Sequence, residues 1–169
     1  MLPKSRAIWL LPAMMAGLLG LFAVLPRIDP LRENIAKLRP AYDWFVVVFS
    51  AFLLIIHVEI LAFNLGYEFP FLNLILAGVA LLFYYTGVLL SKAKRNWFIG
   101  IRTPWTFSDD DVWDETHRVG AKLFKLTAVL ALIGLAFGEY AIYFLLVPLS
   151  ITAFGTIAYS YYLYERTEQ

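Results

Sequence analysis

Long apolar runs constrain this sequence more than any other feature. Five stretches consist mostly of hydrocarbon side chains: about residues 8–25, 44–65, 71–90, 123–137 and 140–162. A helix needs roughly 20 such residues to cross the hydrocarbon core of a bilayer. The chain is 61% apolar, which is more than a soluble domain of this size can bury. We therefore expect an all-α, polytopic integral membrane protein, with one membrane domain over residues 1–169 and about five transmembrane helices.

The distribution of basic residues predicts the orientation of these helices. Lys4 and Arg6 flank the first run, whereas the other 12 of the 14 Lys and Arg residues lie in two charged connections and in the tail. Cytoplasmic segments of membrane proteins carry such an excess of Lys and Arg. We therefore expect a multi-pass protein of the cell membrane, with its N-terminus outside and its C-terminus in the cytoplasm.

The first charged connection has the pattern of a short helix. Asp29 is a candidate N-cap, with Pro30 at the first helical position. Leu31, Ile35 and Leu38 would then fall on one face of that helix. The pattern predicts an amphipathic helix in the headgroup region on the cytoplasmic side.

The second charged connection, residues 92–125, contains a compact polar motif in its segment 92–122. Pro104 biases Thr103 toward extended backbone, so the stretch IRTPWT cannot be helical throughout. Ser108 followed by a run of aspartates is typical of a helix start, with a capping hydroxyl and acids in the first turn. Asp114 and Arg118 would form a favourable pair four residues apart on that helix. The sequence predicts an extended turn, then an amphipathic helix at the cytoplasmic surface.

Two interpretations of the aromatic and basic residues in this segment remain open. Trp97, Trp105 and Trp113 fit an interfacial belt, and Arg102 fits an anchor to lipid phosphate. Alternatively, Arg102 would bond to backbone carbonyls within a structured turn. The belt explains each residue alone, but it explains less well why so many of them occur together.

The stretch GIRTPWTFSDDDVWDETHRVGAKLF resembles the signature of the SdpI family of bacterial and archaeal membrane proteins. That signature has a turn of the form Gly-hydrophobic-Arg-Thr-Pro-Trp-Thr, an acidic stretch, a Trp, and a polar group ending in Arg before an apolar helix. LGYE at 65–68 and GEY at 138–140 also resemble members of the family. The motif and partner-binding residues that the resemblance implies are Gly100, Arg102, Thr103, Pro104, Trp105, Thr106, Trp113, His117 and Arg118.

The resemblance implies a protein of toxin immunity and signalling rather than an enzyme. The best-known member protects the producing cell against a secreted killing peptide and captures a small transcriptional repressor at the membrane. The implied partners are the lipid bilayer, a peptide toxin on the outer side and that repressor on the cytoplasmic side. Family members commonly begin with an additional helix, so we expect a short form that lacks it.

His57 and Glu59 lie inside the second apolar run, which raises an alternative function. Intramembrane charges are costly and usually face a partner in the protein interior. Two residues apart on a helix, these side chains point about 200° from each other. They fit either a proton- or ligand-responsive site of a small transporter or channel component, or structural hydrogen bonds to a neighbouring helix.

Other classes of site have little support in the sequence. The chain has no cysteine, and His57 and His117 lie in different elements without the spacing of metal ligands. No nucleophile–base pairing is evident, and only Arg102, Asp110 and His117 are candidates for an enzyme site at the interface. We expect no enzymatic activity, metal or cofactor, and no direct nucleic-acid partner, because no basic arm is present.

Overall fold

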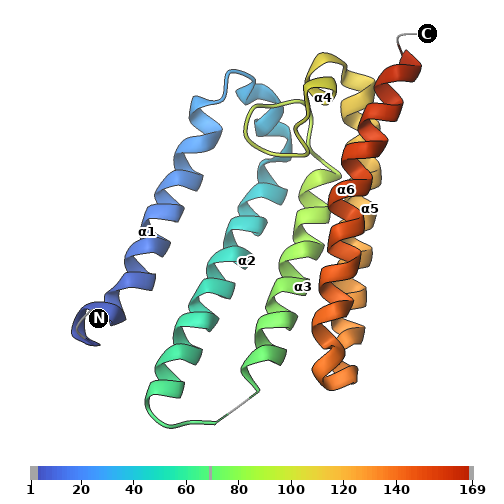
Figure 1. Cartoon of the computed structure of the whole chain (residues 1–169). Helices are drawn as coiled ribbons and strands as arrows, with labels where there is room; N and C mark the ends of the chain where they lie inside the picture. Colours follow the sequence, from blue (N-terminus) through green and yellow to red (C-terminus); the bar gives the residue numbers. More distant parts are fainter. Residues whose placement is uncertain (1–3, 69, 168–169) are drawn as a thin grey trace.

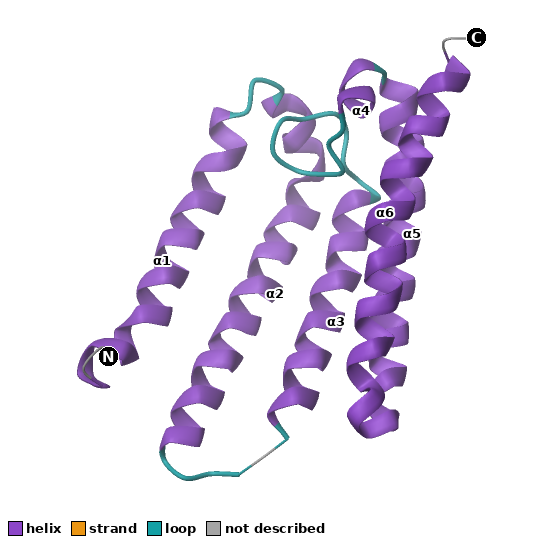
Figure 2. Cartoon of the chain, viewed as in Figure 1, coloured by secondary structure: helices purple, strands orange, loops and turns teal. Residues whose placement is uncertain are grey.

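The computed structural model describes residues 4–68 and 70–167, which form helices joined by loops, with no strand among them (Figure 2). The helices in chain order are α1 (Lys4–Ile28), α2 (Arg32–Asn64), α3 (Phe71–Leu90), α4 (Pro104–Ser108), α5 (Asp110–Gly134), the 3-10 helix η1 (Leu135–Tyr140) and α6 (Ala141–Thr167). The connection between α2 and α3 includes position 69, which lies outside the described residues.

The long helices form an up-and-down bundle. α1, α2, α3, α5 and α6 run in alternating directions, while α4 and the loop before it lie at one end, which we call the cap end (Figure 1). The most extensive packing joins α5 to α3 on one side and to α6 on the other. α1 packs only on α2 within the described residues. The bundle therefore has a tight three-helix unit, with α2 and then α1 added beside it.

The described residues contain four stretches that are long and apolar enough to cross a membrane: Ile8–Ile28, Arg32–Asn64, Phe71–Leu90 and Asp110–Thr167. The last stretch reverses direction at Gly138, whose backbone has φ 58° and ψ −120°, and so holds both α5 and α6. The bundle exposes large apolar side chains along its length, including Phe154 at 74%. These observations confirm an all-α, polytopic membrane protein. The number and limits of the individual crossings stay a prediction.

The predicted short helix at the first charged connection is wrong. α2 is one continuous helix of 33 residues that passes through Pro40, and its N-cap is Leu31 rather than Asp29. Ile35 and Leu38 on its first turns are each 1% exposed and pack with residues of α3 and of the loop that follows it. Burial against protein therefore holds this part of the chain, instead of the lipid headgroups that the sequence pattern indicated.

Small residues bring α3, α5 and α6 together in the apolar part of the bundle. Ala80, Ala131 and Ala141 are almost completely buried in one cluster that joins the helices. Thr127 of α5 and Thr152 of α6 share a buried hydrogen bond of 3.0 Å between their hydroxyls. Small side chains and interhelical hydroxyl bonds are the usual means by which helices associate in lipid.

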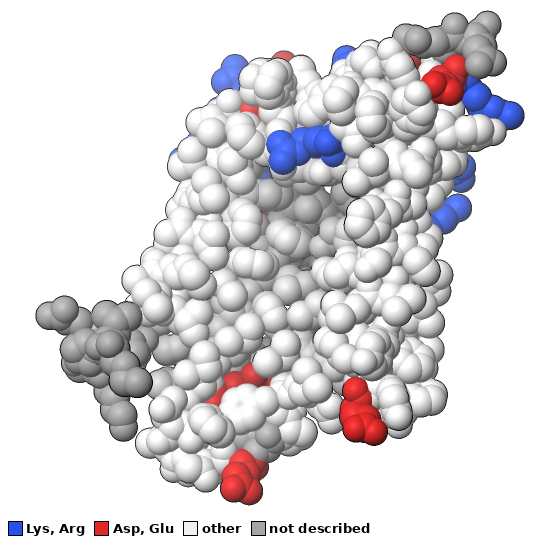
Figure 3. Space-filling view, in the orientation of Figure 1, with Lys and Arg blue, Asp and Glu red and all other residues white. Residues whose placement is uncertain are grey.

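Charges lie mainly at the two ends of the bundle. On the face shown, basic side chains gather toward the cap end together with some acidic ones, whereas the opposite end shows acidic side chains, with a largely uncharged body between the ends (Figure 3). This pattern agrees with the predicted placement of two charged connections and the tail on one side of the membrane. Which side is cytoplasmic stays a prediction.

Candidate functional site

The loop that leaves α3 is folded around a buried amide, Asn96. Its Nδ2 donates to the carbonyl oxygens of Lys94 at 2.9 Å and Ile99 at 2.8 Å. Its Oδ1 accepts from the backbone N–H groups of Phe98 at 3.0 Å and Ile99 at 2.6 Å. Both donors and both acceptor positions of the amide are therefore used. The motif residues expected from sequence did not include Asn96; the signal was a lone Asn between a basic run and a Trp, a residue that favours turns.

Two polar side chains of the first connection hold this loop in place. The Asp29 carboxylate accepts from the backbone N–H of Leu31 at 2.6 Å and from that of Trp97 at 2.9 Å. Asn34 donates from Nδ2 to the carbonyl of Arg95 at 2.8 Å. Asp29 thus joins two connections that are far apart in sequence, which a helix-cap interpretation could not foresee. We call residues 92–122, together with these contacts, the motif cap.

The Thr-Pro-Trp-Thr turn is a capping box. Thr103 is the N-cap of α4 in extended backbone, with φ −119° and ψ 160°, and Pro104 follows at the start of the helix. The Thr103 hydroxyl accepts from the N–H of Thr106, and the Thr106 hydroxyl accepts from the N–H of Thr103. Thr106 is fully buried and also donates toward the carbonyl of Ile101 or that of Thr103. The predicted extended geometry at Thr103 is confirmed, and both threonines have a structural role.

A stacked Trp113–His117 pair forms the centre of the motif cap. The two rings lie 4.1 Å apart between centroids and 17° from parallel, and their side chains are 0% and 1% exposed. Trp113 donates from Nε1 to the carbonyl of Ala93 at 3.0 Å. His117 has Nδ1 2.8 Å from the carbonyl of Trp113, and its Nε2 accepts from the N–H of Ile101 at 2.9 Å. These partners fix the neutral tautomer that carries its proton on Nδ1.

Gly100 is required by the position of this histidine. Its backbone has φ +134°, a conformation that side chains disfavour, and a Cβ at this position would collide with His117 Nε2. The absence of a side chain lets the loop backbone approach the imidazole closely enough for the Ile101 bond. The sequence motif therefore begins with glycine for a steric reason.

Trp105 connects the motif cap to α6, and Arg102 holds together two parts of the cap itself. Trp105 donates from its indole Nε1 to the hydroxyl of Ser160 on α6, and its ring packs edge-on against Tyr161 at 5.3 Å. The Arg102 guanidinium donates to the carbonyl of Trp97. Of the two interpretations that the sequence left open for Arg102, the structure supports the bond to a backbone carbonyl.

The predicted ion pair between Asp114 and Arg118 is wrong. Asp114 pairs with Lys94 of the loop, and Arg118 pairs with Glu115, three residues before it. Glu115 also accepts from the hydroxyl of Tyr159 on α6 at 3.2 Å. The loop before α4 places Lys94 beside the start of α5. Lys94 therefore pairs with Asp114, the residue that helical spacing had assigned to Arg118.

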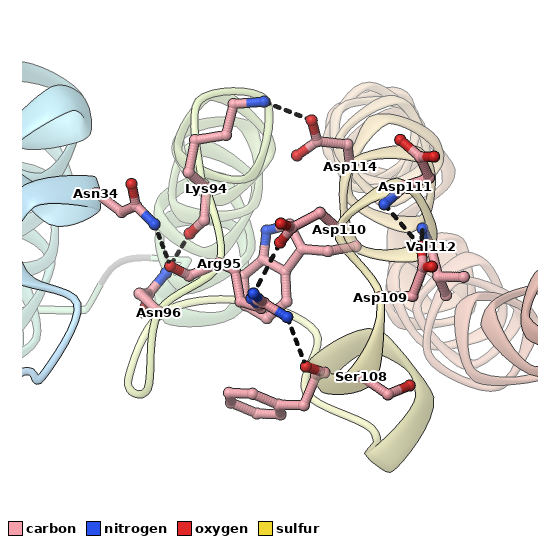
Figure 4. Close-up of polar contacts among 12 residues, drawn as sticks. Asn34, Lys94, Arg95, Asn96, Ser108, Asp109, Asp110, Asp111, Val112 and Asp114 are labelled. Atoms are coloured by element: carbon pink, nitrogen blue, oxygen red, sulfur yellow. Dashed lines mark hydrogen bonds and ion pairs between the residues drawn. The ribbon is translucent and has the colours of Figure 1, made fainter.

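The start of α5 is capped one residue later than predicted. Asp109 is the N-cap, and its Oδ1 accepts from the N–H groups of Asp111 and Val112, each at 2.8 Å (Figure 4). Ser108 instead donates to the carbonyl of Trp105. The negative charge of this carboxylate is also favourable beside the positive end of the helix.

Arg95 ties the loop to both α4 and α5. Its Nε lies 3.0 Å from the carboxylate of Asp110, and its guanidinium donates to the carbonyl of Phe107 at 2.9 Å (Figure 4). Figure 4 also shows Asn34 reaching the Arg95 backbone from α2. The charged residues of the motif cap are thus largely engaged in holding its own loops together.

The tryptophans of the motif cap do not form one belt. Trp97 is 55% exposed, whereas Trp113 is completely buried. The predicted belt position is therefore wrong for Trp113, because its indole fills the space under the loop and bonds to a loop carbonyl.

Glu59 and His57 form a second polar feature, near the end of α2 that lies opposite the cap. Glu59 is 4% exposed, and its carboxylate oxygens have no hydrogen-bond partner among the described residues. It lines an open, otherwise apolar cavity of about 440 Å³ together with Leu54, Val58 and Leu74. His57 Nδ1 also lacks a partner among those residues. Because α2 ends at Asn64, both side chains lie toward that end of the helix and not at its centre.

Comparison with known proteins assigns the motif cap to a family. A sequence model of the SdpI/YfhL protein family matches residues 92–160. The immunity protein SdpI of Bacillus subtilis (strain 168) is 30% identical over 115 residues. Residues 92–160 of this chain belong to the SdpI/YfhL protein family. No solved structure matches the chain.

The similarity to the SdpI immunity protein is partial in length. It extends over 68% of this chain and 56% of the relative, so the chain spans little more than half of that protein. The SdpI/YfhL match at 92–160 covers nearly all of the motif cap, α5, η1 and most of α6. Glu59 and His57 lie outside that matched range.

The three candidates for an enzyme site do not meet in this SdpI/YfhL structure. Arg102 is directed to the Trp97 carbonyl and Asp110 to Arg95. His117 is buried, with both ring nitrogens engaged by the backbone. Among the described residues, no group of three or more His, Asp or Glu side chains could hold a metal ion.

Proposed function

We propose that this protein protects the membrane of its cell against a secreted peptide toxin. The observation that carries the proposal is the 30% identity to a protein named as an immunity protein, combined with the family match over the motif cap. In this proposal, the side of the bundle opposite the cap and the membrane core contact the toxin. The proposed orientation places that side outside the cell and the motif cap in the cytoplasm.

We further propose that the motif cap is the platform for a cytoplasmic regulator, such as a small transcriptional repressor. The buried Trp113–His117 stack and the capping box support this role, because they give the cap a defined surface instead of a mobile loop. Trp97 and Phe98 of the same loop are 55% and 36% exposed. A partner could bind there without unfolding the loop.

The function can be tested at two residues that hold the motif cap in place, one within the cap and one between the cap and α6. Arg102→Ala and Trp105→Ala would be expressed in toxin-sensitive cells and compared with the unmodified protein at equal membrane abundance. We expect each variant to lower survival in that comparison, or to reach a lower membrane abundance than the unmodified protein at the same expression level. The assignment is wrong if both leave protein level and toxin resistance unchanged. Trp44→Ala is the matched control, since Trp44 is 59% exposed on α2 and lies away from the motif.

The environment of Glu59 favours a second candidate function, a small transporter or channel component. A carboxyl group buried in an apolar cavity without a partner is costly, and such groups commonly mark ion or substrate pathways in membranes. Here the transported species would interact directly with Glu59.

Reconstituted liposomes distinguish this candidate from the first. It predicts solute or proton flux that is lost in Glu59→Gln, while Asn64→Asp near the same helix end retains it. Equal flux in empty and protein-containing liposomes would remove this candidate and leave the immunity proposal unaffected.

A further inference from the structure

A basic pocket lies where α3 ends and α5 begins, at the cap end of the bundle. Its volume is about 410 Å³. Five cationic side chains and one carboxylate line it: Lys92, Lys94, Arg118, Lys122, Lys125 and Asp114. The pocket borders the apolar part of both helices, because Leu90 and Ala121 also line it.

The pocket carries positive charge that the protein does not neutralise. Lys94 pairs with Asp114, and Arg118 pairs with Glu115 outside the pocket. In the described part of the chain, Lys92, Lys122 and Lys125 make no ion pair within 4.0 Å. Three ammonium groups around one hollow favour an anion with several oxygen atoms, such as a phosphate.

A second hollow, an apolar groove, lies farther along the same two helices. Its volume is about 300 Å³, and it is lined by Ala77, Ala80, Leu81, Tyr84, Ala128, Val129 and Leu132. On α5, Leu132 of the groove lies two helical turns after Lys125 of the pocket. On α3, Tyr84 of the groove lies two turns before Ser91 of the pocket. Both hollows therefore lie on the same face of each helix. Leu132 is 50% exposed and Tyr84 is 46% exposed, which leaves the groove open to the surroundings of the bundle.

Gly87 lies between the two hollows, where α3 and α5 are in close contact. A Cβ at this position would lie 2.7 Å from the carbonyl oxygen of Ala121 and 2.7 Å from Cγ of Lys125. The glycine therefore lets α5 approach α3 and lets the aliphatic part of Lys125 lie across the contact. The ammonium group of Lys125 can then face the pocket while its carbon stem borders the groove.

We propose that this face of α3 and α5 binds one phospholipid with an anionic headgroup. The phosphate occupies the basic pocket near Lys92, Lys122 and Lys125, and an acyl chain follows the groove past Tyr84 and Leu132. A free phosphate would use only the pocket. The apolar groove, on the same face and along the membrane-crossing part of the helices, favours the lipid.

Native mass spectrometry of the full chain in detergent tests the proposal, with phosphatidylglycerol, phosphatidylcholine and inorganic phosphate as separate probes. We expect phosphatidylglycerol to bind most tightly. Lys122→Gln combined with Lys125→Gln should weaken its binding by about tenfold or more, since each removes one cation beside the phosphate. The matched control is Arg32→Gln with Lys37→Gln, which removes two exposed basic residues of α2 near the cap end of the bundle. This control should bind phosphatidylglycerol as tightly as the unmodified chain does.

A groove variant separates the two parts of the site. Val129→Trp places a large side chain in the groove at a position that is 48% exposed, so folding should persist, as its thermal unfolding would confirm. This variant should lose phosphatidylglycerol binding while the basic pocket stays intact. Equal binding of the two lipids, binding of inorganic phosphate as tight as that of the lipid, or the same loss in the α2 control would each overturn the proposal.

Discussion

Replacing His117 by alanine should open the motif cap. The substitution removes the acceptor of the Ile101 N–H bond at 2.9 Å and the ring stacked on Trp113 at 4.1 Å. An unsatisfied buried donor costs about 1–3 kcal/mol, and an aromatic stack contributes about 0.5–1.5 kcal/mol. A loss of about 3 kcal/mol raises the population of the open cap by roughly a hundredfold.

Limited trypsin digestion in detergent measures that population. The loop presents Lys92, Lys94 and Arg95 as cleavage sites, and Arg95 is held in the closed cap by Asp110. Cleavage after these residues, followed by mass spectrometry, should accelerate strongly in His117→Ala. His57→Ala is the matched control, because it removes the only other histidine from a site in α2 far from the cap. If both variants were cleaved at the rate of the unmodified chain, His117 would not hold the cap closed.

Three further predictions concern single positions. Gly100→Ala should destabilise the cap by about 1–3 kcal/mol or more, because the new Cβ is strained at φ +134° and collides with His117. The same digestion assay should show faster cleavage of this variant. Gly17→Ala, at an open helical site, should be cleaved at the rate of the unmodified chain. Asn96→Leu should expose the loop to trypsin because four backbone groups lose their partner, whereas Asn64→Leu at an exposed helix end should have little effect. Glu59→Leu should raise the thermal midpoint by removing an unsatisfied buried carboxyl worth about 1–3 kcal/mol; a lower midpoint would show that Glu59 has a stabilising partner.

The features that could be predicted from the sequence depend on local patterns. Apolar runs of membrane length predicted the long helices, and Pro104 beside Thr103 predicted the extended entry to α4. The resemblance of the motif located the structured segment and included Gly100, Trp113 and His117. Each of these signals is contained within a few neighbouring residues.

The features that sequence reasoning missed depend on contacts between distant segments. Asp29 has the local pattern of a helix cap, yet it accepts a bond from Trp97, which is 68 residues away. Helical spacing assigns Arg118 as the ion-pair partner of Asp114, but in the folded cap Asp114 pairs with Lys94. Trp113 belongs to a residue type common at membrane interfaces, and only the folded loop above it makes it a core residue.

The most direct test of the central claim is the survival of toxin-sensitive cells that express this chain during exposure to a secreted peptide toxin. The protein should raise survival above that of cells with an empty vector, and His117→Ala should reduce this protection more than His57→Ala at equal membrane abundance. Survival equal to the empty vector, with the protein present in the membrane, would contradict the proposed immunity function.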